Sequence, residues 1–164
     1  MPYVTSQGVR LYYEESGSGT PILFVHEFSG DLRSWEAQIQ HFSRHHRCIA
    51  FNARGYPPSD VPASTARYST RLAVEDMANV LRHLGIRKAH IVGGSMGAAS
   101  TLHFGFTHPR MAIPLTAIGA GSGSSPDRAE NLRRSEANAR RYEAGLAGAL
   151  ELVKKAPNRI LLKH

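Results

Sequence analysis

Residues 90–100, HIVGGSMGAAS, place a serine between glycines where an apolar, β-branched run gives way to small helix-forming residues. Ser95 can be interpreted as a nucleophile on a sharp strand-to-helix turn or as part of a simple glycine turn. A serine hydroxyl attacks only if it is exposed, if a base removes its proton and if the oxyanion that forms is stabilised. The segment can be tested against each of these requirements.

The spacing of small residues favours the nucleophile. A sharp turn exposes the hydroxyl but crowds the backbone, so the positions two before and two after the serine must be small. Gly93 and Gly97 meet this demand. A helix that begins at Met96 would also direct its unpaired N–H groups and the positive end of its dipole toward developing negative charge. A glycine-rich phosphate loop is disfavoured, because the segment has neither GxGxxG spacing nor a P-loop lysine.

The segments on either side alternate between strand and helix patterns. A hairpin is predicted over Tyr3–Ser6 and Val9–Glu15. Further strands are predicted over residues 21–26, 47–52, 89–93 and 111–120, and helices over residues 31–43, 70–84 and 96–108. This alternation predicts an α/β fold, with a mainly parallel sheet and helices on both faces. Ligands of such sheets bind at the carboxyl ends of the strands, where Ser95 lies.

Composition limits the possible classes of protein. The 164 residues are 41% hydrophobic and 20% charged, which is typical of a soluble globular protein, and no apolar run approaches the roughly 20 residues that span a bilayer. We therefore expect a cytoplasmic protein without membrane partners. The single cysteine, Cys48, excludes an intrachain disulfide and a cysteine-based zinc site. A net charge of +7 raises the question of nucleic acid, but the basic run at 128–141 is interrupted by glutamates, so a solvated helix face is favoured.

A second region is predicted after a glycine- and serine-rich linker, which divides the chain into residues 1–125 and 126–164. Residues 127–155 predict a helix with one apolar stripe, which needs a partner surface. The stripe consists of Leu132, Ala139, Tyr142, Leu146, Leu150 and Val153.

Three motifs, in order, resemble those of the α/β-hydrolase family, and the resemblance extends from the N-terminus to about residue 125. They are Gly93–Gly97 (GGSMG), His26–Gly30 (HEFSG, similar to HGxxG) and Asn52–Asp60 (NARGYPPSD, similar to DxRGxGxS). Two positions depart from the family pattern: Glu27 and Pro58 each stand where glycine is usual.

The resemblance implies roles for individual residues. Ser95 would be the nucleophile, the backbone N–H groups of Phe28 and Met96 would form the oxyanion hole, and His26 would orient the oxyanion loop. No cofactor and no metal are implied. Dehalogenases and epoxide hydrolases of this fold attack with an aspartate, whereas a serine implies hydrolysis of an ester-like small molecule, as in an esterase, lactonase, thioesterase or carbon–carbon hydrolase.

The resemblance also implies an acid after the sixth or seventh strand and a histidine after the eighth. The predicted strands number six, so the chain looks truncated, with a cap-like helix at 127–155. The histidines present are poor substitutes: His90 is about 16 Å of strand and His103 about 12 Å of helix away from Ser95. His164 lies in a tail for which no element is predicted. The pair His41 and His45 has metal-ligand spacing but no completing carboxylate, so a solvated helix end is favoured.

Two hypotheses therefore stand. The chain is either a serine hydrolase that uses Ser95, or a truncated family member without turnover. In both cases we expect a homo-oligomer, formed through the exposed edge of the 111–120 strand and the 127–155 helix.

Overall fold

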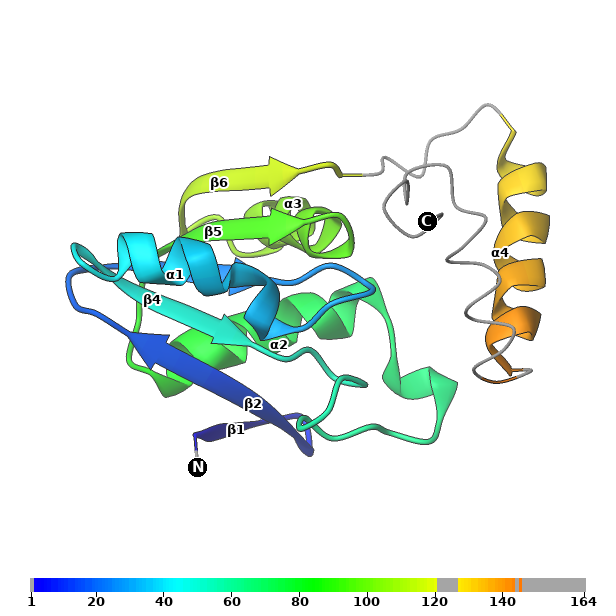
Figure 1. Cartoon of the computed structure of the whole chain (residues 1–164), viewed down its shortest axis with the longest axis horizontal. Helices are drawn as coiled ribbons and strands as arrows, with labels where there is room; N and C mark the ends of the chain where they lie inside the picture. The colour runs from blue at the N-terminus through cyan, green and yellow to red at the C-terminus, as the bar shows by residue number, and fades with distance from the viewer. Residues whose placement is uncertain (1, 121–126, 144, 146–164) are drawn as a thin grey trace, which may run out of the picture. The chain divides into compact units, whose positions relative to one another are not determined.

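The computed structural model describes residues 2–120, 127–143 and 145 (Figure 1). The chain divides into two units, Met1–Gly121 and Ser122–His164. The first unit contains the sheet, and the described residues of the second contain one helix. Among the described residues, no helix combines the length and the apolar character needed to cross a membrane.

The first unit is built on a six-stranded sheet with the order β1-β2-β4-β3-β5-β6. The strands are β1 (Tyr3–Ser6), β2 (Val9–Ser16), β3 (Thr20–Val25), β4 (His46–Phe51), β5 (Ala89–Gly94) and β6 (Ala112–Ile118). β1 and β2 form an antiparallel hairpin, and β2 also pairs antiparallel with β4. The pairs β3–β4, β3–β5 and β5–β6 are parallel, so these four strands point the same way in Figure 1. The predicted mostly parallel α/β sheet is confirmed.

Helices cover both faces of the sheet because consecutive residues of a strand point to opposite sides. On one face, a short 3-10 helix η1 (Leu32–Trp35) and α1 (Glu36–Phe42) pack on β3 and β4. The residues of this cluster are Ile22, Phe24, Leu32, Trp35, Cys48 and Ala50. On the other face, α2 (Thr70–His83) and α3 (Met96–Thr107) pack on the alternate strand residues. Those strand residues are Leu23, Val25, Ile49, Phe51 and Ile91.

Two local predictions need correction. The single helix expected over 31–43 is two consecutive pieces, because the Asp31 carboxylate accepts the N–H of Arg33 and the Asp31 carbonyl accepts that of Ser34 at 3.0 Å, which tightens the first turn. The strand predicted over 47–52 begins one residue earlier, at His46, which is the first residue of β4. Its ring nitrogen Nδ1 contacts the carbonyl of Thr20, the first residue of β3.

The second unit contains α4 (Arg128–Glu143). The helix predicted over 127–155 is thus observed as far as Glu143, and the stripe residues Leu146, Leu150 and Val153 lie outside the described residues. Leu132, the first residue of the predicted stripe, is 61% exposed. Most of the predicted linker, residues 121–126, also lies outside the described residues.

Candidate active site

The junction between β5 and α3 is a single residue, Ser95. Its backbone angles, φ 48° and ψ −108°, lie where side chains other than glycine are rarely found. Such strain persists only when the surrounding structure imposes it, and it concentrates at functional sites. The Ser95 side chain is exposed, and although Ser95 is the N-cap of α3, its hydroxyl makes no capping bond. The hydroxyl is therefore presented to solvent rather than used to hold the helix.

The two glycines around Ser95 allow α3 to approach the sheet closely. A Cβ on Gly93 would collide with the backbone of Gly97, and a Cβ on Gly97 would collide with the carbonyl of Val25 at the end of β3. The N–H of Ser95 also donates to the carbonyl of Ile118 on β6 at 2.8 Å. The turn is thus fixed by strands on both sides of β5.

Tyr56 connects the two residues proposed from the sequence to stabilise an oxyanion. Its hydroxyl donates to the carbonyl of Phe28 at 2.9 Å and lies 3.7 Å from the sulfur of Met96. Burial, together with the nearby charge of Glu27, raises the pKa of Tyr56 above its ordinary value, so the hydroxyl remains a donor. The structure therefore brings Phe28 and Met96 together, one on the loop after β3 and the other at the start of α3.

His26 is buried against this loop, and both of its ring nitrogens have partners. Nδ1 lies 2.7 Å from the carbonyl of Glu27, and Nε2 accepts the N–H of Ala53 at 3.1 Å. The ring also packs edge-on against Tyr56, with 4.5 Å between the ring centroids. Burial lowers the pKa of His26. A neutral imidazole with both nitrogens occupied holds the loop and is not free to take a proton from Ser95.

Glu27, one of the departures from the family pattern, is accommodated by its neighbours. Its carboxylate accepts the hydroxyl of Ser34 at 2.8 Å and lies where a side chain on Gly30 would be. The carbonyl of Glu27 accepts the N–H of Gly30 at 3.4 Å. The glycine at position 30 thus leaves the space that the side chain at position 27 fills.

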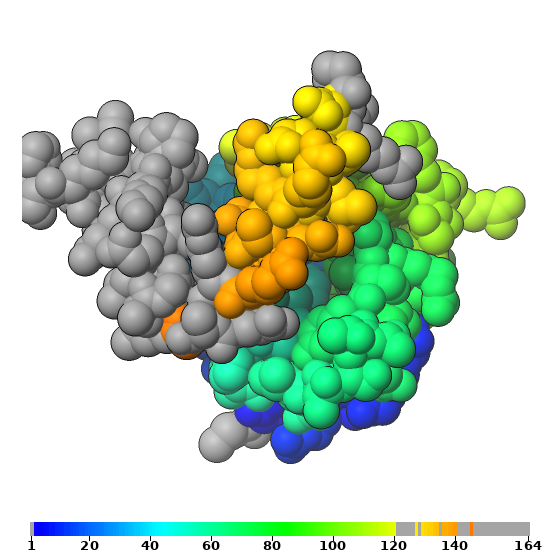
Figure 2. Space-filling model, turned by 90° about the vertical axis from the view of Figure 1, so that its right-hand side faces the viewer, coloured from blue at the N-terminus to red at the C-terminus, as the bar shows by residue number. Residues whose placement is uncertain are grey.

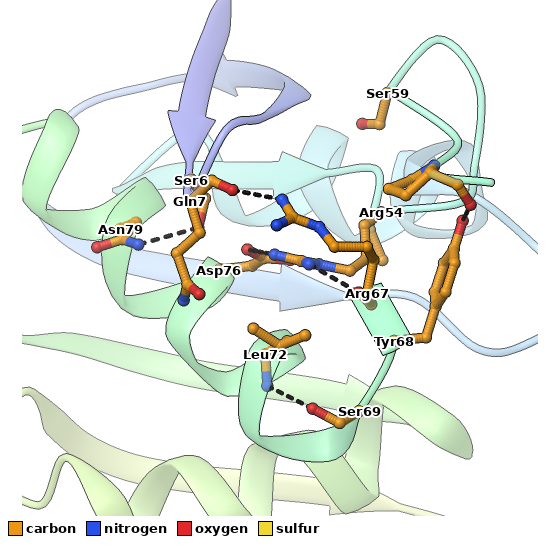
Figure 3. Close-up of polar contacts among 12 residues, drawn as sticks. Ser6, Gln7, Arg54, Ser59, Arg67, Tyr68, Ser69, Leu72, Asp76 and Asn79 are labelled. Atoms are coloured by element: carbon orange, nitrogen blue, oxygen red, sulfur yellow. Dashed lines mark hydrogen bonds and ion pairs between the residues drawn. The ribbon is translucent and has the colours of Figure 1, made fainter. Parts of the chain in front are cut away.

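The loop after β4 is fixed by buried polar contacts, some of which appear in Figure 3. Arg54 makes two bonds of 2.7 Å to the carboxylate of Asp76 on α2, and its third nitrogen donates to the carbonyl of Arg67 at 2.8 Å. The side chains of this ion pair are only 3% and 1% exposed. Nearby, the ring of Tyr68 lies where a side chain on Gly55 would be, and φ is +88° at Gly55. Figure 2 looks onto the end of the sheet at which the parallel strands terminate and shows this loop, in blue-green, at the surface.

A pocket of about 570 Å³ lies between this loop, α2 and α3. Phe28, Tyr56 and Met96 line it on the side of the elbow, and Tyr68, Ala73 and Met77 line it elsewhere. Its charged residues, Arg54 and Asp76, are paired with each other, so the pocket suits an uncharged, largely apolar group.

A comparison with known families agrees with this geometry. The family model described as "alpha/beta hydrolase fold" matches residues 20–132, which include the HEFSG loop, the NARGYPPSD loop and the elbow. The chain belongs to the α/β-hydrolase fold family.

Individual members of the family differ in the chemistry that their names state. Over 113 residues the chain is 33% identical to epoxide hydrolase 3 of Mus musculus, a match that covers 68% of this chain and 31% of that protein. Over 110 residues it is 33% identical to a putative non-heme chloroperoxidase of Synechocystis sp., with 63% and 39% covered. The chain thus spans about a third of the length of these curated relatives.

Among solved structures, the chain is similar to Est816, described as an N-acyl homoserine lactone degrading enzyme. The TM-score is 0.71 and the identity 30%, with 80% of this chain and 52% of Est816 covered. An epoxide hydrolase of Vigna radiata gives a TM-score of 0.67 at 28% identity, with 70% and 36% covered. The family fold therefore accommodates lactone and epoxide substrates in proteins similar to this one.

The other histidines have surroundings of their own within the described residues. His108 lies 2.9 Å from a carboxylate oxygen of Glu75 on α2, and the ring of His90 lies 6.4 Å from that of His46. No group of three or more metal-ligating side chains occurs in the part of the chain that the structure describes. His164 lies outside that part.

The sequence missed the contribution of Tyr56. It lies inside the NARGYPPSD motif, but its partners Phe28 and Met96 are 28 and 40 positions away along the chain. An aromatic hydroxyl in a loop that follows a central parallel strand is a usable signal, because such loops meet at one edge of the sheet.

Proposed function

We propose that Ser95 is the nucleophile of a serine hydrolase that cleaves uncharged carboxylic esters, lactones included. The observation that carries this proposal is the exposed Ser95 hydroxyl on a strained junction, at the N-terminus of a twelve-residue helix. A structural serine at the start of a helix would accept a backbone N–H with its hydroxyl oxygen, as Ser69 accepts that of Leu72 at the start of α2. The backbone of Ser95 is strained, yet its hydroxyl makes no capping bond that would compensate for the strain. This combination is typical of a reactive residue.

The chemistry follows from the arrangement of donors. The Ser95 oxygen would bond to the ester carbonyl carbon, and the carbonyl oxygen would become an oxyanion. The N–H groups of Met96 and Phe28 would donate to it, aided by the positive end of the α3 dipole. The Ser95 hydroxyl would lose its proton to solvent, collapse would break the bond to the alcohol oxygen, which takes up a proton as it leaves, and water would then hydrolyse the acyl-enzyme. His26 does not supply the base in this proposal, because both of its ring nitrogens are occupied.

The pocket supports an uncharged acyl group. Its volume of about 570 Å³ is within the usual range for small-molecule sites, and its charged lining residues, Arg54 and Asp76, neutralise each other. Est816 is described as degrading N-acyl homoserine lactones, an ester-type substrate with an apolar acyl chain. A serine nucleophile favours this class over epoxides, for which the family resemblance implies an aspartate.

The second hypothesis, a family member without turnover, is favoured by one observation. His26, whose carbonyl lies close to Gly97 of the elbow, has both ring nitrogens occupied by backbone groups. Triad members act as a unit, and removal of the base costs several orders of magnitude in rate.

The test is reaction of the full chain with a fluorophosphonate probe, compared among the wild type, Ser95→Ala and Ser64→Ala. Ser64 is a matched control, because it is an exposed N-cap serine whose hydroxyl also makes no capping bond. We expect stoichiometric labelling of the wild type and of Ser64→Ala, and none of Ser95→Ala. Equal labelling of all three proteins would refute the proposal, and the absence of labelling in all three would favour the second hypothesis.

A further inference from the structure

A second hollow lies at the opposite end of the sheet from Ser95. It is formed where β3 and β4 begin and by the loops that lead from α2 into β5 and from α3 into β6. Its volume is about 730 Å³. The amino ends of the parallel strands meet here, whereas Ser95 follows the carboxyl end of β5.

The lining of this hollow is strongly cationic. Arg47, Arg87, Lys88 and Arg110 line it, and none of the residues that line it carries a carboxylate. Arg47 is held in place by Glu15, 2.7 Å away, and by the carbonyl of Leu84 at 3.4 Å. These contacts fix one wall of the hollow.

The other three cations have no such partners. Within the described residues, the side chains of Arg87, Lys88 and Arg110 form no ion pair and no hydrogen bond, and all three are exposed. Elsewhere on this unit, arginines such as Arg10 and Arg33 are paired with aspartates. Like charges that share a concave site repel one another, and a multivalent anion relieves this repulsion.

We propose that this hollow binds a small molecule that carries phosphate groups, of the diphosphate class. The planar guanidinium groups of Arg87 and Arg110 can each bond two oxygens of a phosphate, and Lys88 adds a point charge, whereas the nitrogens of Arg47 are already bonded to Glu15 and Leu84. Several positive charges around one hollow match a di- or polyanion better than a single carboxylate. The lining contains no aromatic side chain on which a base could stack, which disfavours single-stranded nucleic acid.

The site would also have a mechanical effect. Arg87 and Lys88 precede β5, and Arg110 precedes β6, so one bound anion would bridge the loops that enter both strands. Ser95 directly follows β5, and β6 carries the carbonyl that accepts the Ser95 N–H. The site does not depend on the proposed function, because it needs no chemistry at Ser95.

The test is calorimetric titration of the full chain with pyrophosphate, compared among the wild type and two charge-matched triple variants. One variant combines Arg87→Gln, Lys88→Gln and Arg110→Gln. The control combines Arg33→Gln, Arg44→Gln and Arg71→Gln, which remove the same charge from exposed sites outside the hollow. We expect the first variant to lose at least about tenfold in affinity and the control to lose less than about twofold.

Binding to vesicles identifies the source of the phosphate. Stronger binding to vesicles that contain a phosphoinositide than to soluble pyrophosphate, lost in the first variant only, would assign the same site to a lipid headgroup. Equal loss of pyrophosphate binding in both variants would overturn the proposal, since binding would then reflect net charge alone. It would equally be overturned if pyrophosphate failed to bind at millimolar concentration, or if a single-stranded oligonucleotide bound more tightly than pyrophosphate at the same salt concentration.

Discussion

Replacement of Arg54 by methionine should destabilise the first unit far more than the same replacement at Arg33. Both arginines form multiple bonds to an aspartate, Arg54 to Asp76 and Arg33 to Asp31. The first pair is buried, with 3% and 1% of the side chains exposed, whereas 81% of the Arg33 side chain is exposed. Removal of one partner leaves a buried, unpaired charge only in the Arg54–Asp76 pair.

The magnitude follows from that difference. Removal of one partner of a buried ion pair costs about 3–5 kcal/mol, because the remaining charge is uncompensated, while an exposed pair contributes about 0–1 kcal/mol. Arg54→Met also leaves the carbonyl of Arg67 without its donor, which places the cost toward the upper end. With an unfolding entropy of about 0.25 kcal/mol/K for a unit of this size, the melting temperature should fall by about 12–20 °C.

Urea denaturation followed by circular dichroism measures these free energies. The double variant Arg54→Met/Asp76→Leu should recover part of the loss, because it removes the orphaned carboxylate as well. The slope of free energy against urea should stay unchanged across the series. The reasoning from burial would be wrong if Arg54→Met lowered the free energy of unfolding no more than Arg33→Met does. It would also be wrong if the double variant lost more free energy of unfolding than the two single variants, Arg54→Met and Asp76→Leu, lose together.

Four further outcomes are expected. Gly97→Ala should cost about 1–3 kcal/mol in urea unfolding, because the new Cβ meets the carbonyl of Val25, and a cost below about 0.5 kcal/mol would contradict the close approach of α3. Tyr56→Phe should slow fluorophosphonate labelling of Ser95 and cost about 1 kcal/mol through the lost bond to the Phe28 carbonyl; unchanged labelling would show that Tyr56 does not position the loop. Sedimentation at micromolar concentration should show self-association that Ile118→Lys reduces, since Ile118 is 54% exposed on β6, and a monodisperse wild-type monomer would exclude it. Burial lowers the pKa of His26 in the folded state, so the unfolded state binds the proton more readily, and the free energy of unfolding should fall as pH drops below about 6.5. His26→Gln should flatten that dependence on pH, and an equally steep profile in the variant would argue against a neutral His26.

The alternation of elements could be predicted because each element carries its own local pattern. Thr70–His83 has apolar residues at helical spacing, and the buried strands are continuous apolar runs. The order of the strands could not be predicted in this way. β2 pairs with β4 rather than with β3, its neighbour in the chain, and this choice depends on contacts between residues such as Tyr13 and Phe51, far apart in sequence.

In the candidate site, too, local features could be predicted from the sequence and contacts between distant segments could not. The positions that need small residues, Gly93 and Gly97, are visible in the sequence because the steric demand is local. The ion pair of Arg54 with Asp76 and the position of Tyr56 are not visible, because each joins segments that only the folded sheet brings together. The cationic hollow was missed for another reason: Arg47, the pair Arg87 and Lys88, and Arg110 lie in three separate parts of the chain and form no long run.

The bond between the Ser95 N–H and the Ile118 carbonyl has a consequence for biosynthesis. A ribosome adds Ser95 well before Ile118, so the growing polypeptide cannot form this bond until the sixth strand has emerged and docked beside the fifth. Nascent chains stopped before residue 118 would therefore carry the motif without one of the contacts that hold its turn.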